Sequence, residues 1–465
     1  MSDELCFMPA TEMAKRIAAR ELSPVEVMDA VLARAEAMDT RLNLFALPLF
    51  DTAREAARIA EAAVMAGAAL GPLHGVPITV KDNVAVAGLR MTNGSAAFLD
   101  NIVAADAAVV ARAKEAGAII IGKTNLPEFA HKVLTDSPAF GVTRSPWSLE
   151  HTPGGSSGGA SAALAAGIAP LAIGTDGGGS IRCPSSCCGL TGIKATLGRI
   201  PLEAPDGFAA YFFVGPMARC SADTALLLSV MAGPLAADPY SLAAPALAEK
   251  RRPAENAARG LRIGWIEHFG PYRTESEVAQ LTGSAVRHLA AEGAIVEDVS
   301  EPAFDDVFAT YTVIASSAHA ARYGGLVERW RDRMTPSMVE SIEKGTRWSA
   351  IDWVRAHDRR TTLFRAVQAL FERFDVIATP TMIAPPKPLD AGGSIATEMY
   401  AEWAAPLYPF NLTGHPAISV PAGFTADGLP AGLQLIGPWF AEERLLNVAA
   451  LLEERDRWHE RRPPI

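Results

Sequence analysis

The stretch GTDGGGSIR, from Gly174 to Arg182, places three consecutive glycines directly before a serine. Such a run forms helices and strands poorly, so we expect a loop at this position. Glycines let several backbone amides converge on one point because no side chain stands in the way. The amides of residues 177–180 are therefore expected to bind one oxygen together, as an oxyanion hole does, with the Ser180 hydroxyl beside them.

A second loop of this kind, GGSSGG, covers residues 154–159 and carries Ser156 and Ser157. A segment of small residues and a short apolar run separate the two loops, so both loops are expected at one edge of a sheet. A glycine-rich turn with incidental serines, or a phosphate-binding nest, would explain one loop alone. Two such loops, with Lys81 at the end of the apolar run 76–80, favour nucleophilic catalysis.

Helical and strand patterns alternate along the chain. Ser23 precedes Pro24 in a capping-box pattern that predicts a helix ending near Met38. Further helices are expected over 51–66, 106–116, 158–167, 222–231, 274–292 (capped by Thr274) and 442–454, with mostly helical sequence over 305–371. Strands are expected over 76–80, 118–121, 171–173, 262–266, 376–379, 417–420 and 433–436. The alternation predicts an α/β fold with a large mixed, mostly parallel central sheet covered on both faces by helices.

Composition excludes several classes of protein. The formal net charge of -10 argues against nucleic acid as a main ligand, because phosphate binding requires a basic face. The first residues, MSDELCF, carry neither the basic nor the apolar part of a secretory leader, and the longest apolar run is interrupted by Pro170. The five cysteines include no CxxC pair and are interpreted as reduced, buried thiols. A cytoplasmic protein without a membrane span is therefore expected.

Two short motifs offer other functions. GAIIIGKT, residues 117–124, matches the P-loop pattern, but its interior residues are strand formers and a helix precedes it, so a helix-turn-strand is favoured over a nucleotide site. Residues 154–158 match the G-x-S-x-G elbow of esterases, although the lead-in is polar and broken by proline. An esterase using Ser156 or Ser157 with His415 or His459 stays open as an alternative.

With both glycine loops, the segments 75–82, 122–130, 189–194 and 432–437 make the sequence resemble the amidase signature family over most of its length. The resemblance is weakest over about 235–374. It implies one domain over 1–465, with a catalytic core at 70–200 and a divergent substrate-pocket region at about 235–374. Two departures are Gly177, where the family often has a larger residue, and Ala195, where it often has proline; Gly177 is expected to widen the pocket floor.

The resemblance also implies the roles of single residues. Ser180 would be the nucleophile, Ser156 a bridging serine after a cis peptide bond, and Lys81 the base. Burial lowers the pKa of a lysine, which lets it act as a base. The remaining implied or inferred roles are an oxyanion hole at Gly177, Gly178 and Gly179, support of the bridging serine by Ser157, and a loop-fixing pair, Asp176 and Arg182. Lys123 and Lys194 are interpreted as structural lysines that satisfy loop carbonyls.

The substrate is less well defined by the sequence. The candidate substrate-binding residues are Thr152, Asp206, Tyr211 and Phe212, with Tyr311, Trp330 and Trp348 in the divergent segment. We expect hydrolysis of an apolar or aryl amide, an anilide or a carbamate, with ester cleavage as a side activity and without a metal or cofactor. A glutaminase-type component of an amidotransferase is the alternative within the family. A homodimer is one option for the assembly.

Overall fold

The computed structural model describes residues 2–203, 210–243, 256–389 and 402–465. Its centre is an eleven-stranded sheet with the order β1-β3-β2-β6-β8-β7-β12-β13-β11-β9-β10. The strands are β1 Phe45–Pro48, β2 Pro77–Lys81, β3 Ile119–Thr124, β6 Leu171–Asp176, β7 Thr191–Lys194, β8 Phe213–Ala218, β9 Arg262–Trp265, β10 Ile295–Asp298, β11 Val376–Pro380, β12 Ala417–Phe424 and β13 Pro430–Ile436, with β4 Asp136–Ser137 and β5 Gly141–Val142 in a separate small sheet.

The sheet is mixed, as expected, but it is not mostly parallel. Strand β2 runs parallel to β3 and β6, and β9 runs parallel to β10 and β11. The central run β6-β8-β7-β12-β13-β11 is antiparallel throughout. Strands β12 and β13 are joined by a short turn after Phe424, which only an antiparallel pair permits. The alternation of helical and strand patterns does not reveal the direction of each strand, because strand pairing is set by tertiary packing.

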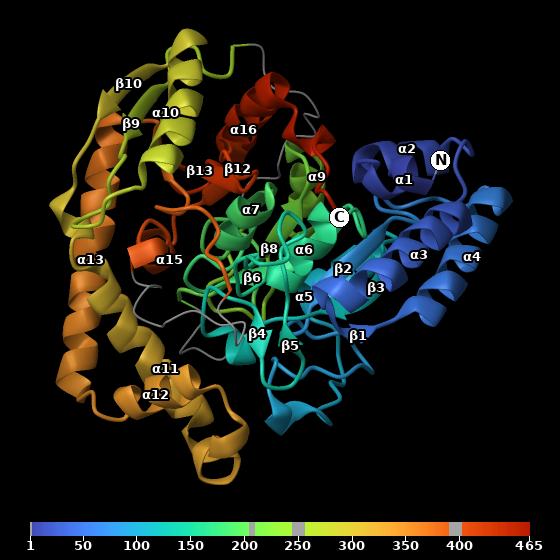
Figure 1. Cartoon of the computed structure of the whole chain (residues 1–465), viewed down its shortest axis with the longest axis horizontal. Coiled ribbons are helices and arrows are strands. Elements are labelled where there is room, and N and C mark those ends of the chain that lie inside the picture. The colour runs from blue at the N-terminus through green and yellow to red at the C-terminus, as the bar shows by residue number, and fades with distance from the viewer. Residues whose placement is uncertain (1, 204–209, 244–255, 390–401) are drawn as a thin grey trace.

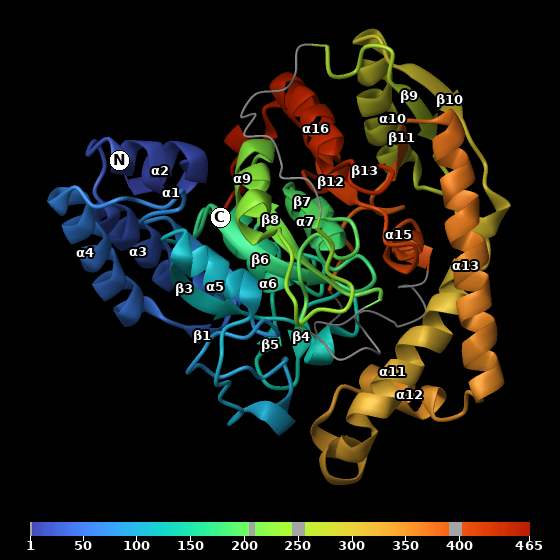
Figure 2. The same cartoon turned by 180° about the vertical axis from the view of Figure 1, so that it is seen from behind.

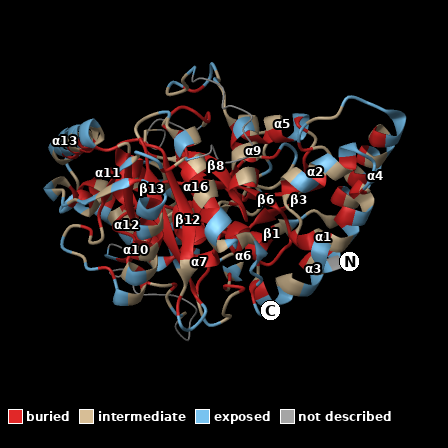
Figure 3. Cartoon of the chain, turned by 90° about the horizontal axis from the view of Figure 1, so that it is seen from above, coloured by how far each residue is buried: buried red, intermediate tan, exposed pale blue. Residues whose placement is uncertain are grey.

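Helices cover the sheet on both faces, as expected. Helices α6 and α7 lie on one side of the strands and α5 and α9 on the other (Figures 1–3). The α-helices are α1 Ser2–Phe7, α2 Ala10–Ala18, α3 Pro24–Leu42, α4 Phe50–Ala66, α5 Ala108–Glu115, α6 Gly158–Ala165, α7 Arg182–Cys188, α9 Ser221–Met231, α10 Ser276–Ala291, α11 Val307–Trp330, α12 Pro336–Gly345, α13 Ala350–Arg373, α15 Tyr408–Leu412 and α16 Glu442–Asp456. Short 3-10 turns are η1 Ala96–Phe98, η2 Glu128–Ala130, η3 Pro302–Phe304, η4 Arg331–Arg333 and η5 Trp458–Glu460.

Local sequence explains where helix α3 begins. The Ser23 hydroxyl accepts the amides of Val25 and Glu26 at 3.0 and 3.3 Å, so it caps α3 as the pattern predicted. Helix α10 begins at Ser276 rather than at Thr274, since the Thr274 hydroxyl donates to the carbonyl of Glu267 instead of capping the helix. The P-loop-like segment forms strand β3 after α5, which confirms the helix-turn-strand interpretation.

Burial is greatest in the strands and in the helices beside the two glycine loops. Every residue of β2, β6, α6 and α7 is buried, and buried residues run through the middle of the molecule in Figure 3. All five cysteines are free and buried, as expected. Within the described ranges, no helix combines the length and apolarity needed to cross a bilayer. Helices α11, α12 and α13 extend to one side of the sheet (Figure 1), in the segment where the family resemblance is weakest.

Candidate active site

The sheet brings the two glycine loops together. Strands β2 and β6 are parallel neighbours, so Lys81 at the end of β2 and Asp176 at the end of β6 lie at the same edge. The GGSSGG loop leads into α6, and the GGGS loop follows β6. The Ser157 amide donates to the Ser180 carbonyl at 3.2 Å, which joins the two loops directly.

Lys81 is fully buried among hydroxyl groups. Its Nζ lies 2.7 Å from Ser156 Oγ, 2.9 Å from Ser157 Oγ and 2.9 Å from Thr175 Oγ1. The peptide bond between Gly155 and Ser156 is cis. Burial lowers the pKa of Lys81 well below its usual value, and the charge of Asp176 offsets only part of this effect. The structure thus brings Lys81, Ser156 and Ser157 together, with the amine favoured in its neutral form.

The hydrogen bonds around Lys81 suit a neutral amine, which has two donors and one lone pair. Ser157 Oγ donates its proton to the Thr175 carbonyl at 3.2 Å, so it accepts from Lys81. Thr175 Oγ1 accepts from Asn83 at 3.0 Å and is placed to accept from Lys81 as well. In the neutral amine these two bonds use both donors, and the lone pair faces the Ser156 hydroxyl at 2.7 Å.

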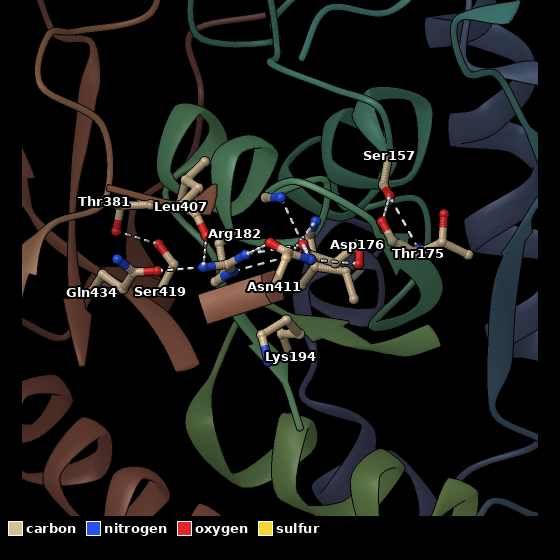
Figure 4. A network of polar contacts seen from close by, with 12 residues as sticks. Ser157, Thr175, Asp176, Arg182, Lys194, Thr381, Leu407, Asn411, Ser419 and Gln434 are labelled. Atoms are coloured by element: carbon tan, nitrogen blue, oxygen red, sulfur yellow. Dashed lines mark hydrogen bonds and ion pairs between the residues drawn. The ribbon is translucent and has the colours of Figure 1, made fainter. Parts of the chain in front are cut away.

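The loop that carries Ser180 is fastened by a buried charged network (Figure 4). The Asp176 carboxylate accepts the amides of Gly179 at 2.6 Å and Ile181 at 3.2 Å, and two nitrogens of Arg182 at 3.0 Å each. Burial alone would raise the pKa of Asp176, but Arg182, Asn411 and Lys194 lower it below its usual range. The carboxylate is therefore charged and holds the loop in place.

Asn411 and Gln434 tie this network to the C-terminal part of the chain. The Asn411 amide donates to the Asp176 carboxylate and to the Asp176 and Tyr211 carbonyls at 2.9, 2.9 and 3.1 Å. Gln434 accepts from Arg182 at 2.6 Å. Neither residue was singled out from the sequence. Gln434 lies within the family-like segment 432–437, which was the only available signal.

The expected oxyanion hole is altered at one position. The Gly179 amide is directed at Asp176, so it supports the loop rather than an oxyanion in this structure. Gly177, Gly178 and Ser180 line a cavity of about 320 Å³. The correction at Gly179 arises because a carboxylate three residues earlier accepts its amide, a local contact that the glycine pattern does not reveal.

The cavity wall next to Ser180 is aromatic. It includes Tyr211, Phe212, Phe308, Tyr311 and Tyr408. A Cβ atom built on Gly178 would lie 2.6 Å from the Tyr311 hydroxyl, so this helix α11 side chain packs directly on the loop. A Cβ atom built on Gly177 would lie 2.6 Å from the Phe212 ring. Gly177 therefore does not widen the pocket floor, because the Phe212 ring occupies the space that a side chain would take.

Other candidate residues lie elsewhere. Thr152 accepts the Gly154 amide at 3.1 Å and supports the GGSSGG loop without lining this cavity. Asp206 lies outside the described residues. Trp330 packs with Arg329 and Arg333, and Trp348 lines a neighbouring cavity while donating to Ser316 at 2.9 Å. Cavity residues that sequence reasoning missed are Tyr408, His319 and His131; His131 directly follows the family-like segment 122–130.

Lys123 and Lys194, two further buried lysines, have structural partners, as expected. Lys123 pairs with Asp82 at 3.0 Å and donates to the Arg90 carbonyl at 3.3 Å. Lys194 donates to the backbone carbonyls of His415 and Ala195, and its Nζ lies 4.0 Å from the centre of the Phe213 ring. Neither lysine contacts the serines of the two glycine loops through any of these bonds.

The two histidines of the esterase alternative also contact residues outside the glycine loops. His415 hydrogen-bonds Thr413 at 2.9 Å and lies among aromatic rings, and burial lowers its pKa to about 3. His459 pairs with Glu453 at 2.7 Å in the last helical turns. Neither histidine is among the residues that line the cavity at Ser180. The esterase alternative thus gains no support from the geometry.

Comparison with known proteins places this fold and site in a family. A sequence model described as Amidase matches residues 26–446. The chain is 36% identical to the acylamidase of Rhodococcus erythropolis, covering 99% of this chain and 98% of that protein. It is also 36% identical to a glutamyl-tRNA(Gln) amidotransferase subunit of Moorella thermoacetica, covering 99% of each. The chain therefore belongs to the amidase signature family.

Solved structures agree with this assignment. A bacterial aryl acylamidase of the amidase signature family superposes with a TM-score of 0.90 at 29% identity, covering 98% of both chains. A substrate complex of 6-aminohexanoate cyclic dimer hydrolase superposes with a TM-score of 0.88 at 30% identity, covering 99% of both chains. The large mixed sheet with helices on both faces is thus the fold of this family.

Proposed function

We propose that this protein hydrolyses the C–N bond of apolar or aryl carboxamides through an acyl-Ser180 intermediate, with Lys81 as the base and Ser156 as the bridging serine. One observation carries the proposal: the buried Lys81 Nζ lies 2.7 Å from Ser156 Oγ, on the loop that is hydrogen-bonded to Ser180. Burial that keeps the amine neutral is what a lysine base requires.

The proton path follows from the hydrogen bonds around Lys81. In acylation, the Ser180 hydroxyl attacks the amide carbonyl carbon while its proton passes to Ser156 Oγ, and the Ser156 proton passes to the Lys81 lone pair. The same route in reverse protonates the departing amine, so the C–N bond breaks with a neutral leaving group. Water then attacks the acyl ester by the same relay and releases the carboxylic acid and free Ser180.

The developing oxyanion needs donors that are already in place. We assign the Gly177 and Gly178 amides to this role because both residues line the cavity with Ser180, whereas the Gly179 amide is taken by Asp176. Asp176 and Arg182 act through the loop as positioning residues. Ser157 supports the relay by accepting from Lys81, which leaves the lone pair directed at Ser156.

The aromatic cavity wall supports an apolar or aryl substrate. Tyr211, Phe212, Tyr311 and Tyr408 surround the space next to Ser180. Flat aromatic side chains favour apolar and aromatic groups over small polar ones. The similarity to an acylamidase and to an aryl acylamidase points in the same direction. Anilides and aryl carbamates place the same carbonyl carbon beside the nucleophile, so both are expected substrates.

The alternative is a glutaminase that works within an amidotransferase, because the relatives include glutamyl-tRNA(Gln) amidotransferase subunits at 36–38% identity. Glutamine is small and zwitterionic, and the aromatic wall near Ser180 offers it little charge complementarity. We therefore place this function second.

The test is a substrate panel with an aliphatic amide, an anilide, an aryl carbamate, an aryl ester and glutamine, assayed with the wild type and with Ser180→Ala. Cleavage of the anilide that is lost in the variant supports the proposal. Turnover of glutamine alone would favour the alternative. Ester cleavage that survives in the variant would identify a different nucleophile and overturn the assignment.

A further inference from the structure

The cavity at Ser180 changes character along its length. Its wall on helix α11 consists of side chains on one face, Phe308, Tyr311, Thr312, Ala315, Ser316 and His319. Tyr311 packs on Gly178 of the nucleophile loop, whereas His319 lies eight residues further, about 12 Å along the helix axis. The cavity therefore extends along α11, and Tyr311 marks its end at Ser180.

The far end is bordered by polar side chains of helix α12. Ser337, Glu340, Ser341 and Lys344 line the cavity with the i, i+3, i+4, i+7 spacing of one helix face. His319 Nδ1 lies 2.8 Å from Ser341 Oγ, which places this face beside the distal end of the α11 wall. Glu340 and Lys344 are exposed, so the cavity opens to solvent here.

The proton of one α12 hydroxyl can be located from its partner. His131 Nδ1 lies 2.7 Å from the Glu128 carbonyl, which can only accept, so Nδ1 carries the ring proton. Burial and the neighbouring Lys132 lower the pKa of His131 well below its usual value, so the ring is neutral. His131 Nε2 is then an acceptor, and Ser337 Oγ, at 2.7 Å, donates to it. The lone pairs of Ser337 Oγ are left as acceptors at the cavity wall.

The loop that presents His131 is held firmly against α12. Phe129 and Ala130 have positive φ angles of 52° and 57°, which non-glycine residues adopt at a cost of order 1 kcal/mol or more. Glu128 accepts the Thr335 amide at 2.6 Å just before α12, and the Phe129 ring packs with Met338 and Ile342 of that helix. The His131–Ser337 hydrogen bond is therefore held in place by the surrounding contacts between the loop and α12.

We propose that the cavity selects an elongated amide whose apolar part lies against the aromatic side chains beside Ser180 and whose distal end carries an O–H or N–H group that donates to Ser337 Oγ. This inference rests on the proposed amidase function and adds the polar end of the substrate to it. A terminal methyl group of equal size would leave the Ser337 acceptor without a partner, which is how a site discriminates between isosteric groups.

The probes are nitroanilides in matched pairs that differ only in a terminal hydroxyl or methyl group. The tail is attached to the acyl chain in one series and to the aniline ring in the other, and its length is stepped by one methylene at a time within each series. For the tail that reaches α12, we expect the hydroxyl compound to have a kcat/KM about five- to tenfold above that of its methyl partner. Ser337→Ala should reduce this ratio to about one, and Ser337→Thr, which keeps the hydroxyl, should restore it.

Ser229→Ala is the matched control, because Ser229 is an exposed serine of α9 outside the cavity, and it should keep the ratio of the wild type. A ratio near one in the wild type for both series, or a ratio that survives Ser337→Ala, would overturn the inference while amide cleavage still stands. Absence of cleavage for every anilide would instead refute the proposed function, so the two failures are distinguishable.

Discussion

The loop that carries Ser180 has different kinds of side chains on its two sides. Behind the loop, Lys81, Asp176 and Arg182 are fully buried, and each is held by several hydrogen bonds from distant parts of the chain. In front of it, helices α11 and α12 present aromatic rings and hydroxyl groups, and the charged residues stand at the open rim. The difference separates the chemistry from the choice of substrate: side chains on the two helices can change without disturbing the buried charges.

The largest expected effect tests the chemical side. Ser180→Ala should lower kcat/KM for an anilide on the order of 10⁴-fold or more, since the acyl-enzyme can no longer form. The fold should persist because Ser180 is a small residue at a loop, which thermal unfolding would verify. A variant that retains a tenth of the wild-type rate would contradict the assignment of the nucleophile.

Lys81→Met removes the proposed base while keeping the length of the side chain. We expect kcat/KM to fall by about 10³-fold or more, since the relay loses its acceptor. Lys114→Met, an exposed lysine paired with Asp106, is the control and should retain the wild-type rate. Equal values of kcat/KM for the two lysine variants would contradict the assignment of the buried Lys81 as the base.

The pH dependence of kcat/KM also tests the role proposed for Lys81. The pKa of Lys81 is lowered by burial, and only the neutral amine accepts a proton. The rate should therefore fall as the pH drops below this lowered pKa and be level above it, with the inflection well below 10.5, the ordinary lysine value. A profile of kcat/KM that keeps rising up to pH 10.5 would show that Lys81 is protonated at neutral pH.

Asp176→Asn tests the fastening of the loop. The change keeps the shape of the side chain but leaves the buried Arg182 charge without a counter-ion, which should cost about 3–5 kcal/mol of unfolding free energy. The matched control is Asp375→Asn, where the partner Arg262 is about half exposed and the loss should be small. Denaturant titration of both variants measures the contrast. Equal losses would mean that burial does not distinguish these two ion pairs.

The smallest expected effect concerns the front of the loop. Gly177→Ala should displace the Phe212 ring, because the added Cβ would lie 2.6 Å from it. We expect a change of KM by about three- to tenfold, with a smaller change in kcat, as for an altered contact that serves binding. Gly325→Ala on α11 is the control, because its added Cβ would meet no described atom within 4 Å, and it should leave both constants unchanged.

The chemical side could be predicted from the sequence much further than the substrate side. The serines and the Asp176–Arg182 pair lie in short glycine-rich segments whose backbone needs are visible in the residues themselves, and Lys81 ends an apolar run in a segment that resembles the family. Asn411 could not be found this way, because its contact with Asp176 spans 235 residues and an isolated asparagine carries no local signal. The antiparallel centre of the sheet and the cavity face of α11 and α12 likewise depend on tertiary packing.

A second long contact, between Arg182 and Gln434, has a consequence for biosynthesis. Arg182 is joined to Gln434 across 252 residues, so the loop that follows β6 leaves the ribosome long before its anchors exist. At roughly 5–20 residues per second, this interval is about 13 to 50 s. During that time the loop has its local bonds to Asp176 but lacks the bonds to Asn411 and Gln434. The Ser180 loop therefore reaches its final set of bonds only after the C-terminal strands enter the sheet.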